Sequence, residues 1–496
     1  MKPIDSFSLT RWRTATRHFR VLSLACTTMF ASGWANTALA ADIGFEQAWQ
    51  LMLQNNHGIA AEQANVQRYA QLAEGTKAMD LPSVTLGANY TRLDQDITLS
   101  GQQLLDSTDA ALPPPAMLPP TIAPIVGSLL GTTSTIAEKD ILSSSVRVIW
   151  PIFTGGRIDA AQRAARGRLD EAKSHQAMAL QGRYDDLSRY YFTVQLAKAV
   201  LQTRQEVEQG LAQHLDAAKK LEQQGQIAKV ERLQAQAAFD KAIVDRQKAA
   251  HDLTMAKAAF AKQINQQTGQ QSNQQNELSP GDPLFINAHL PPLHAFIEQT
   301  LATYPGLSLL DAKDSQAHSL VDAEKGKYYP NVYLYGDYNL YEDDSLASQM
   351  KPDWLVGVGV SIPLIDNTGR SEQLQAAHSA VLQVRHLKAQ AKQNLALLVQ
   401  KTYLEAQQAI DEANGLNSSI ALAKENILLR QTAFAQGLGD SLDVVDAQLY
   451  LASVQTQQLV ARYRYVIALN KLLALSGQTA QFAQYQQSSV AHVAAH

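Results

Sequence analysis

The sequence predicts a mixed α and β protein, mainly α, in which one structural unit occurs twice in tandem. All 17 prolines lie outside residues 152–279 and 364–496, and such long proline-free runs favour long helices. Residues 58–90 resemble residues 306–338, with glycine, proline and tyrosine at matching positions, which indicates an internal repeat. After the repeated proline the hydrophobic period changes from about 3.6 residues to 2, which indicates that strands follow a helix.

The composition excludes several classes of protein. The chain carries 42 basic and 46 acidic residues, a formal net charge of −4, so no basic excess points to nucleic acid. Its one cysteine, Cys26, excludes disulfide scaffolds, iron–sulfur clusters and cysteine-ligated zinc. The histidines form no H-x-x-x-H pair beside an acid, and no nucleophile has a base nearby. We therefore predict that the protein is not an enzyme and has no cofactor and no metal site.

The first 40 residues are typical of a secretory signal peptide. Basic residues precede an apolar run over residues 21–30, and residues 38–40 provide a small-x-small cleavage site. Cleavage there leaves a mature chain that starts near Ala41 and contains no cysteine. The alternative is a lipoprotein with lipid attached to Cys26, but this requires an aliphatic residue where the sequence has Ser23.

Each repeat begins with a helix of about 23 residues, over 58–80 and 306–328, and continues with two strands. We predict these strands over residues 82–97, 141–153, 330–342 and 353–364. An apolar face, a small or polar opposite face and terminal aromatic residues are typical of a membrane β-barrel wall. An ordinary sandwich strand with one buried face is the alternative. The candidates for a membrane-interface girdle are Tyr90, Trp150, Tyr338 and Trp354.

Four strands are too few to close a barrel, since about eight is the smallest number and lipid tolerates no open sheet edge. No segment of the mature chain is predicted to be a membrane-spanning helix, because the longest uncharged stretch, residues 110–137, contains six prolines. Several copies of the chain are therefore expected to share one barrel. Two copies with eight strands and three copies with twelve both remain possible on this argument.

The proline-free runs predict two long helical hairpins. Their outgoing helices cover residues 157–224 and 370–436, and each ends at a glycine, Gly225 or Gly437. The returning helices are shorter by about the length of the 23-residue helix that opens each repeat. We expect that helix to stack end to end with the returning one. The Ala- and Gln-rich surfaces predict closely packed, coiled-coil-like walls.

These patterns divide the chain into five segments. They are a signal peptide at 1–40, a first repeat at 41–265 with its hairpin over 157–265, a linker at 266–292, a second repeat at 293–477 with its hairpin over 369–477, and a polar tail at 478–496. The tail is predicted to be disordered. The insertion at 97–140 is expected to form an irregular, proline-rich cap outside the cell.

The duplicated order resembles the TolC-type outer membrane efflux proteins, over nearly all of the mature chain. The resemblance rests on the proline-bounded strand pairs, on Thr-Gly-Gly-Arg at 154–157, and on the second turn with its Leu-Asp-Val-Val-Asp-Ala segment at 442–447. It implies a homotrimer whose twelve strands form one barrel in outer membrane lipid and whose helices form a periplasmic tunnel. It also implies a periplasmic adaptor and an inner-membrane pump as partners. The hairpin tips that would bind the adaptor are Gly225, Gln226, Ile227, Gly437, Leu438 and Gly439.

The resemblance also places a channel constriction at the second hairpin. Asp443 and Asp446 lie three residues apart on one helix face, where similar proteins line the narrow periplasmic end with acids. Three copies would form carboxylate rings that favour cations. Glu231 follows the first turn at the matching position, and Phe434 is expected to form a steric collar. The alternative for all three acids is a solvated residue at a helix start.

Family members can close this end with tyrosine and arginine contacts, whereas the aligned positions here are Phe434 and Gly439. The predicted lock is therefore absent or rebuilt, with no cation at Gly439 to pair with the acids. The predicted function is the exit duct of a tripartite efflux or type I secretion system. A periplasmic coiled-coil adaptor or a structural scaffold is the alternative. Drugs, metals and proteins use similar ducts, so the cargo stays open.

Overall fold

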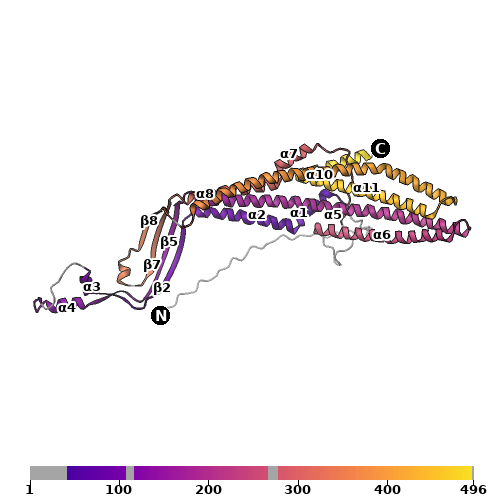
Figure 1. Ribbon diagram of the computed structural model, residues 1–496. Coiled ribbons are helices and arrows are strands. Elements are labelled where there is room, and N and C mark those ends of the chain that lie inside the picture. Colours follow the sequence, from indigo (N-terminus) through magenta and orange to yellow (C-terminus); the bar gives the residue numbers. More distant parts are fainter. Residues whose placement is uncertain (1–41, 108–116, 266–277, 344, 366, 494–496) are drawn as a thin grey trace, which may run out of the picture.

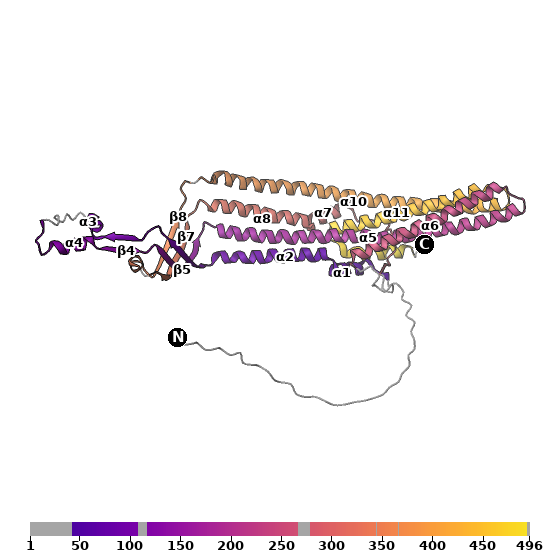
Figure 2. The ribbon, with the colours of Figure 1, turned by 90° about the horizontal axis from the view of Figure 1, so that it is seen from below.

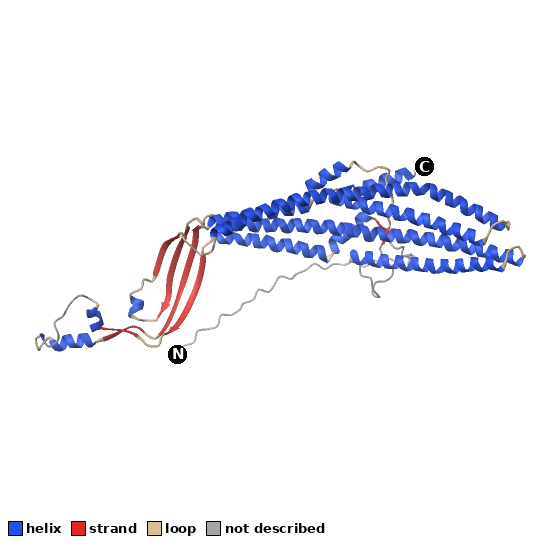
Figure 3. Ribbon diagram, viewed as in Figure 1, coloured by secondary structure: helices blue, strands red, loops and turns tan. Residues whose placement is uncertain are grey.

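The structure is a computed structural model, and it describes residues 42–107, 117–265, 278–343, 345–365 and 367–493. The predicted signal peptide lies outside these residues. The described chain is elongated, with a β-sheet toward one end and long helices that run to the other (Figure 1). Strands and helices occupy separate parts of the length (Figure 3).

Two hairpins of very long helices form most of the molecule. The first consists of α5 (Arg157–Gln223) and α6 (Lys229–Gln263), and the second of α10 (Arg370–Ala435) and α11 (Ser441–Leu475). Good helix formers such as Ala, Gln, Leu and Lys dominate these segments, and no proline interrupts them. The predicted hairpins are confirmed, with ends that differ by a few residues.

A shorter helix continues the line of each returning helix. These helices are α2 (His57–Gly75), with its 3-10 extension η1 (Thr76–Asp80), and α8 (Pro305–Gly326). At the first junction the Asn56 side-chain amide donates to the carbonyl of Gln263 at 3.5 Å. At the second, the Thr303 hydroxyl donates to the carbonyl of Ser476 at 3.1 Å. The end-to-end stacking predicted from the helix lengths is therefore confirmed.

The helices form one layer with two free edges. Helix α5 packs against α2, α6, α8 and α11, whereas α10 packs against α8 and α11. Beside the sheet the order across the layer is α2, α5, α8 and α10 (Figure 2). Farther along, α6 contacts α11 as well as α5, and α7 (Leu293–Thr303) packs on α10. Beside the sheet, α2 and α10 have no helix on their outer sides among the described residues.

Four strands form one antiparallel sheet in the order β2-β5-β7-β8. Their bounds are Ser83–Arg92, Asp140–Phe153, Asn331–Glu342 and Trp354–Ser361. The register aligns Leu86, Val146, Tyr338 and Trp354 across the sheet. Because side chains alternate between faces, this register joins the apolar sets of all four strands into one continuous face. Within the described chain this face is open, and Leu86 is 71% exposed.

The first predicted strand, 82–97, is too long, and the insertion that follows it is more regular than predicted. Strand β2 ends at Arg92, and beyond a turn β3 (Ile97–Ser100) pairs with β4 (Thr133–Ala137) in a separate ribbon. Two short helices complete the insertion, α3 (Gly101–Asp106) and α4 (Ala123–Gly131). The expected irregular cap is therefore wrong for the described part, while residues 108–116 lie outside it. Pro124 sits in the first turn of α4, where the missing N–H costs no hydrogen bond.

A belt of short elements packs on the middle of the helical layer and supplies the largest core. The belt comprises β1 (Asp42–Ile43), which pairs in parallel with β6 (Ser279–Pro280), and the helices α1 (Phe45–Asn55), α7 (Leu293–Thr303) and α12 (Phe482–Val493). Phe45 is only 2% exposed, and its ring contacts those of Tyr184 and Phe482. Aromatic side chains thus fasten the belt to α5.

The predicted disorder of the tail is wrong for its described residues, 478–493. A 3-10 turn, η4 (Thr479–Gln481), leads into α12, and Phe482 inserts into the belt core with 4% exposure. The tail's polar composition concealed this anchor, which is joined by Tyr485, a partly buried residue packed against the same core. The part of the predicted linker from residue 278 onward also belongs to the belt, where Phe285 is 6% exposed. Residues 266–277 lie outside the described chain.

Candidate functional site

The two hairpin tips share one backbone turn. Gly225 and Gly437 adopt left-handed conformations, with φ of 70° and 72°. The next residue in each turn donates its backbone N–H to a carbonyl five residues earlier: Gln226 to Leu221 and Leu438 to Ala433, both at 2.9 Å. These bonds end the outgoing helices in the Schellman geometry, which requires a residue that tolerates positive φ. Leu438 is 78% exposed at the far end of the molecule.

Asp443 has a cationic partner that the sequence analysis missed. A guanidinium nitrogen of Arg430, on the outgoing helix α10, lies 2.7 Å from its carboxylate. Gly439 offers no cation to these acids, as expected from the sequence, but Arg430 supplies one to Asp443 from a position that was not considered. The sequence carries this signal, because Arg430 and Asp443 lie on either side of the turn at Gly437.

Asp446 lies in a different environment from Asp443. It borders a groove of about 310 Å³ between α5, α6 and α11. Arg204, Lys241 and Asp245 also line this groove, whose apolar residues include Leu211 and Val445. The two acids are three residues apart on α11, yet one points toward α10 and the other toward the first hairpin. The structure thus places them near each other without a shared partner.

Glu231 and Phe434 do not line an open surface. One carboxylate oxygen of Glu231 accepts the backbone N–H of Ser441 at 2.7 Å, so Glu231 caps the start of α11. Phe434 is 2% exposed and packs among residues of all four long helices, including Leu215, Ala235 and Val444. It does not form the expected steric collar in this conformation, because its ring is part of the intrachain core.

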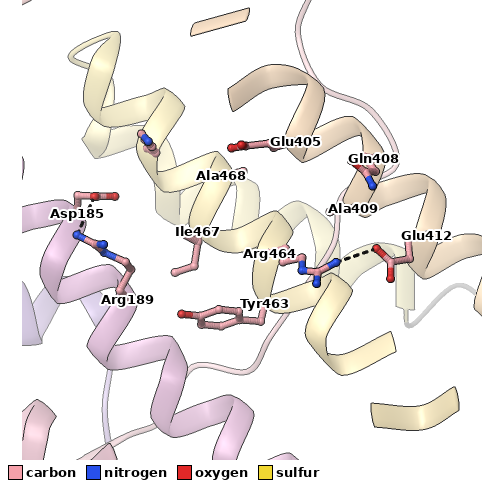
Figure 4. A pocket seen from close by; sticks show the side chains of 11 residues that line it. Asp185, Arg189, Glu405, Gln408, Ala409, Glu412, Tyr463, Arg464, Ile467 and Ala468 are labelled. Atoms are coloured by element: carbon pink, nitrogen blue, oxygen red, sulfur yellow. Dashed lines mark hydrogen bonds and ion pairs between the residues drawn. The ribbon is translucent and has the colours of Figure 1, made fainter. Parts of the chain in front are cut away.

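A second charged region lies at the middle of the helical layer. A pocket of about 440 Å³ between α5, α10 and α11 holds two ion pairs, Arg189 with Asp185 and Arg464 with Glu412, each at 3.3 Å (Figure 4). Burial raises the pKa of the Asp185 carboxyl despite the opposing attraction of nearby cations. On α11 the pocket is lined by Arg464, Ile467 and Lys471, while the neighbouring Tyr465 is buried in the belt core.

The predicted girdle aromatics share the apolar face of the sheet. Tyr338 pairs directly with Trp354, and the exposures of the four range from 42% for Trp150 to 65% for Trp354. Trp150 lies toward the helical end of β5, and Tyr90 lies toward the opposite end of β2. Their role as an interface girdle stays a prediction.

The opposite face of the sheet carries small and polar side chains. Arg147 and Asp337 form an ion pair there at 3.0 Å. The rings of Tyr333 and Tyr335 lie over Gly359 and Gly357, where a Cβ atom would collide with them. The glycines of β8 are therefore needed for this close aromatic packing.

Within the described ranges, none of the helices combines the length and the apolar character that a membrane span requires. The same residues contain no group of three or more His, Cys, Asp or Glu side chains placed to hold a metal ion.

Comparisons with known proteins agree with this architecture. A family model described as outer membrane efflux protein matches residues 48–266 and 296–478. Outer membrane protein TolC of Vibrio cholerae is 24% identical over 348 residues, which cover 68% of this chain and 76% of TolC. The structure of CusC has a TM-score of 0.70 at 16% identity, covering 90% of this chain and 95% of that one. The open-state MtrE outer membrane channel of Neisseria gonorrhoeae has a TM-score of 0.67 at 17% identity, covering 90% and 94%.

Proposed function

The chain belongs to the outer membrane efflux protein family, and from this we propose that it is the exit duct of a tripartite efflux or type I secretion system. Proteins of this family are efflux channels of the outer membrane and are not enzymes. In this role the duct receives substrate from an inner-membrane pump and a periplasmic adaptor. The proposal rests on one observation: the sheet and the helical layer beside it each have two free edges, and these lie on the same two sides of the molecule.

The free edges support assembly into a closed ring of three copies. Strands β2 and β8 end the sheet, and α2 and α10 end the helical layer beside it on the corresponding sides. Joining the β8 edge of one copy to the β2 edge of the next removes every open sheet edge, which lipid requires. The α10 edge also exposes leucines at heptad spacing, with Leu397 at 65% and Leu404 at 52%. Twelve strands leave room for water inside the barrel.

Disulfide trapping tests this ring, because the mature chain contains no cysteine of its own. Cysteines at Thr85 or Asn89 in β2 are combined with cysteines at Leu355 or Ser361 in β8, since the intersubunit register is unknown. At least one combination is expected to give covalent dimers and trimers in the membrane. Cysteines at Ser145 and Asn339, which pair within the chain, are the control and should give only monomers. Monomers alone from all four combinations would contradict the ring.

The exposed hairpin tips support adaptor binding at Gly225 to Ile227 and Gly437 to Gly439. A photoreactive residue at Gln226 or Leu438 should crosslink in cells to an inner-membrane-anchored periplasmic protein with a helical hairpin, identified by mass spectrometry. The control position is Gln484 on α12, which is exposed but belongs to the belt. Adducts from Gln484 with none from either tip would contradict this docking site.

The acids of α11 form the proposed constriction, now without Phe434 as a collar. Three copies would bring Asp443 and Asp446 around one axis, which favours cations and provides oxygen ligands for multivalent ones. Replacing both with alanine should weaken cation selectivity and abolish block by multivalent cations in bilayer recordings. Asp240→Ala on α6 is the control, because that carboxylate bonds only within its own helix. Unchanged selectivity and block in the double variant would contradict a constriction formed by these acids.

A further inference from the structure

The two hairpins meet at a buried polar contact near their tips that the constriction does not use. The imidazole Nε2 of His214, on α5, lies 2.8 Å from the hydroxyl of Ser441, at the start of α11. His214 is 5% exposed and Ser441 is fully buried. The ring of Phe434, on α10, lies 4.5 Å from the imidazole between centroids. One histidine of the first hairpin therefore contacts both helices of the second.

Glu231 holds the same point from the other helix of the first hairpin. Its carboxylate accepts the backbone N–H of Ser441 at 2.7 Å, across a sequence separation of 210 residues. Asp440, the N-cap residue of α11, makes no side-chain capping bond of its own. Glu231 therefore satisfies an N–H that the local sequence leaves open, and its negative charge suits the positive end of the helix dipole.

We infer that His214, Glu231 and Ser441 form a latch that holds the start of α11, and with it the acids of the constriction, against the first hairpin. The inference rests on the proposed channel, because there the position of α11 sets the width of the periplasmic end. Moving α11 away from α5 and α6 breaks both hydrogen bonds. The latch differs from a purely apolar contact because one of its members is an imidazole, a side chain whose ordinary pKa lies close to neutral pH.

Several charged groups on the helices around His214 are engaged with other partners, and Asp440, beside Ser441, is exposed to solvent. Glu231 on α6 bonds to the Ser441 amide, Arg430 on α10 pairs with Asp443 on α11, and Lys220 on α5 pairs with Asp216. Among the contacts of the described residues, none of these groups bonds to the imidazole. A proton on His214 would therefore be a buried charge that, among the described contacts, no carboxylate touches directly.

The latch should accordingly weaken in acid. Burial lowers the pKa of His214, and hydrogen bonding to the backbone of Ser441 opposes this without outweighing it. In the released state, with the imidazole in water, the pKa returns to its ordinary value of about 6.5. Protonation therefore favours release. The stabilisation from His214 is present in full above about pH 6.5 and is lost as the pH falls through and below that value.

Distances between the tips test the latch in the intact chain in detergent. Spin labels on cysteines at Gln226 and Leu438 report the separation of the two hairpins by pulsed electron resonance. The parent should gain a population with longer distances between about pH 7.5 and about pH 5.5. His214→Gln keeps a neutral hydrogen-bonding side chain and should abolish this pH response. Ser441→Ala should shift the population ratio by about two- to tenfold already at neutral pH, as expected for one net hydrogen bond.

His175→Gln is the matched control, since that histidine is exposed and lies 3.3 Å from a carboxylate oxygen of Glu62 on α2. It should leave the pH response intact. A response that survives in His214→Gln, or an unchanged distribution in Ser441→Ala, would overturn the latch. Bilayer conductance of the same proteins separates this outcome from failure of the proposed function. If none of them conducts ions, the channel proposal fails, while the tip distances still decide the latch.

Discussion

The two hairpin tips have the same backbone turn but different side-chain partners. Gly225 and Gly437 lie 212 residues apart, and both carry the left-handed conformation that the turn requires. At the same spacing, Glu231 of the first hairpin corresponds to Asp443 of the second. Glu231 crosses to the other hairpin and caps α11, whereas Asp443 pairs with Arg430 of its own hairpin. Equivalent acids therefore have opposite roles, one between the hairpins and one within a hairpin.

A second pair of equivalent positions diverges in the same way. Glu222 forms a 2.6 Å ion pair with Arg232 that stabilises the first tip from within. Its counterpart, Phe434, is buried where the two hairpins interlock. Duplication has thus preserved the turn, which depends on one glycine and on backbone hydrogen bonds, while the side chains specialised. The first tip provides Glu231, which caps α11 of the second hairpin. The second tip receives this cap and carries the acids of the proposed constriction.

The largest effect should come from truncating the buried aromatic. Phe434→Ala is expected to destabilise the second tip by about 3–4 kcal/mol, because it leaves a cavity in a core shared by four helices. Glu222→Ala, at the equivalent position, should cost only about 0–1 kcal/mol, since its ion pair is partly solvated. Hydrogen exchange of peptides covering the two tips measures both. Equal loss of protection would show that the tips have not diverged in packing.

An intermediate effect should distinguish the two equivalent acids. Glu231→Ala removes the cap of α11 and should cost about 1–2 kcal/mol, seen as faster amide exchange at the start of α11 on the other hairpin. Asp443→Ala removes a pair whose side chains are 44–48% exposed, and after solvent screening about 0–1 kcal/mol is expected. Fast exchange confined to α6 in Glu231→Ala would contradict the crossing contact.

The smallest effect is expected at the turn glycines of the two tips, Gly225 and Gly437. Gly225→Ala and Gly437→Ala should each lower the free energy of unfolding by about 1 kcal/mol. The two losses should be similar, because both substitutions place a Cβ at positive φ with open space around it. Gly75→Ala is the control, since Gly75 has φ of −58° and no atom near its Cβ position. It should be neutral or slightly stabilising. Unequal costs at the two turns, measured by thermal unfolding in detergent, would show that their backbones differ in strain.

The sequence by itself determined the duplication, the long helices, the four strands of the sheet and the glycine turns. These features depend on local rules: proline ends helices, alternation of period 2 makes strands, and left-handed turns need glycine. It did not determine where Phe434 points, which cation pairs with Asp443, or that His214 joins the hairpins. An α-helix drifts by about 20° per heptad against a coiled-coil repeat, so over a 66-residue helix the face at the tip depends on supercoiling. The His214 contact with Ser441 spans 227 residues, and Phe482 docks on a core built by distant segments. Only the tertiary structure decides such contacts, because they follow from how whole helices pack and not from any local pattern.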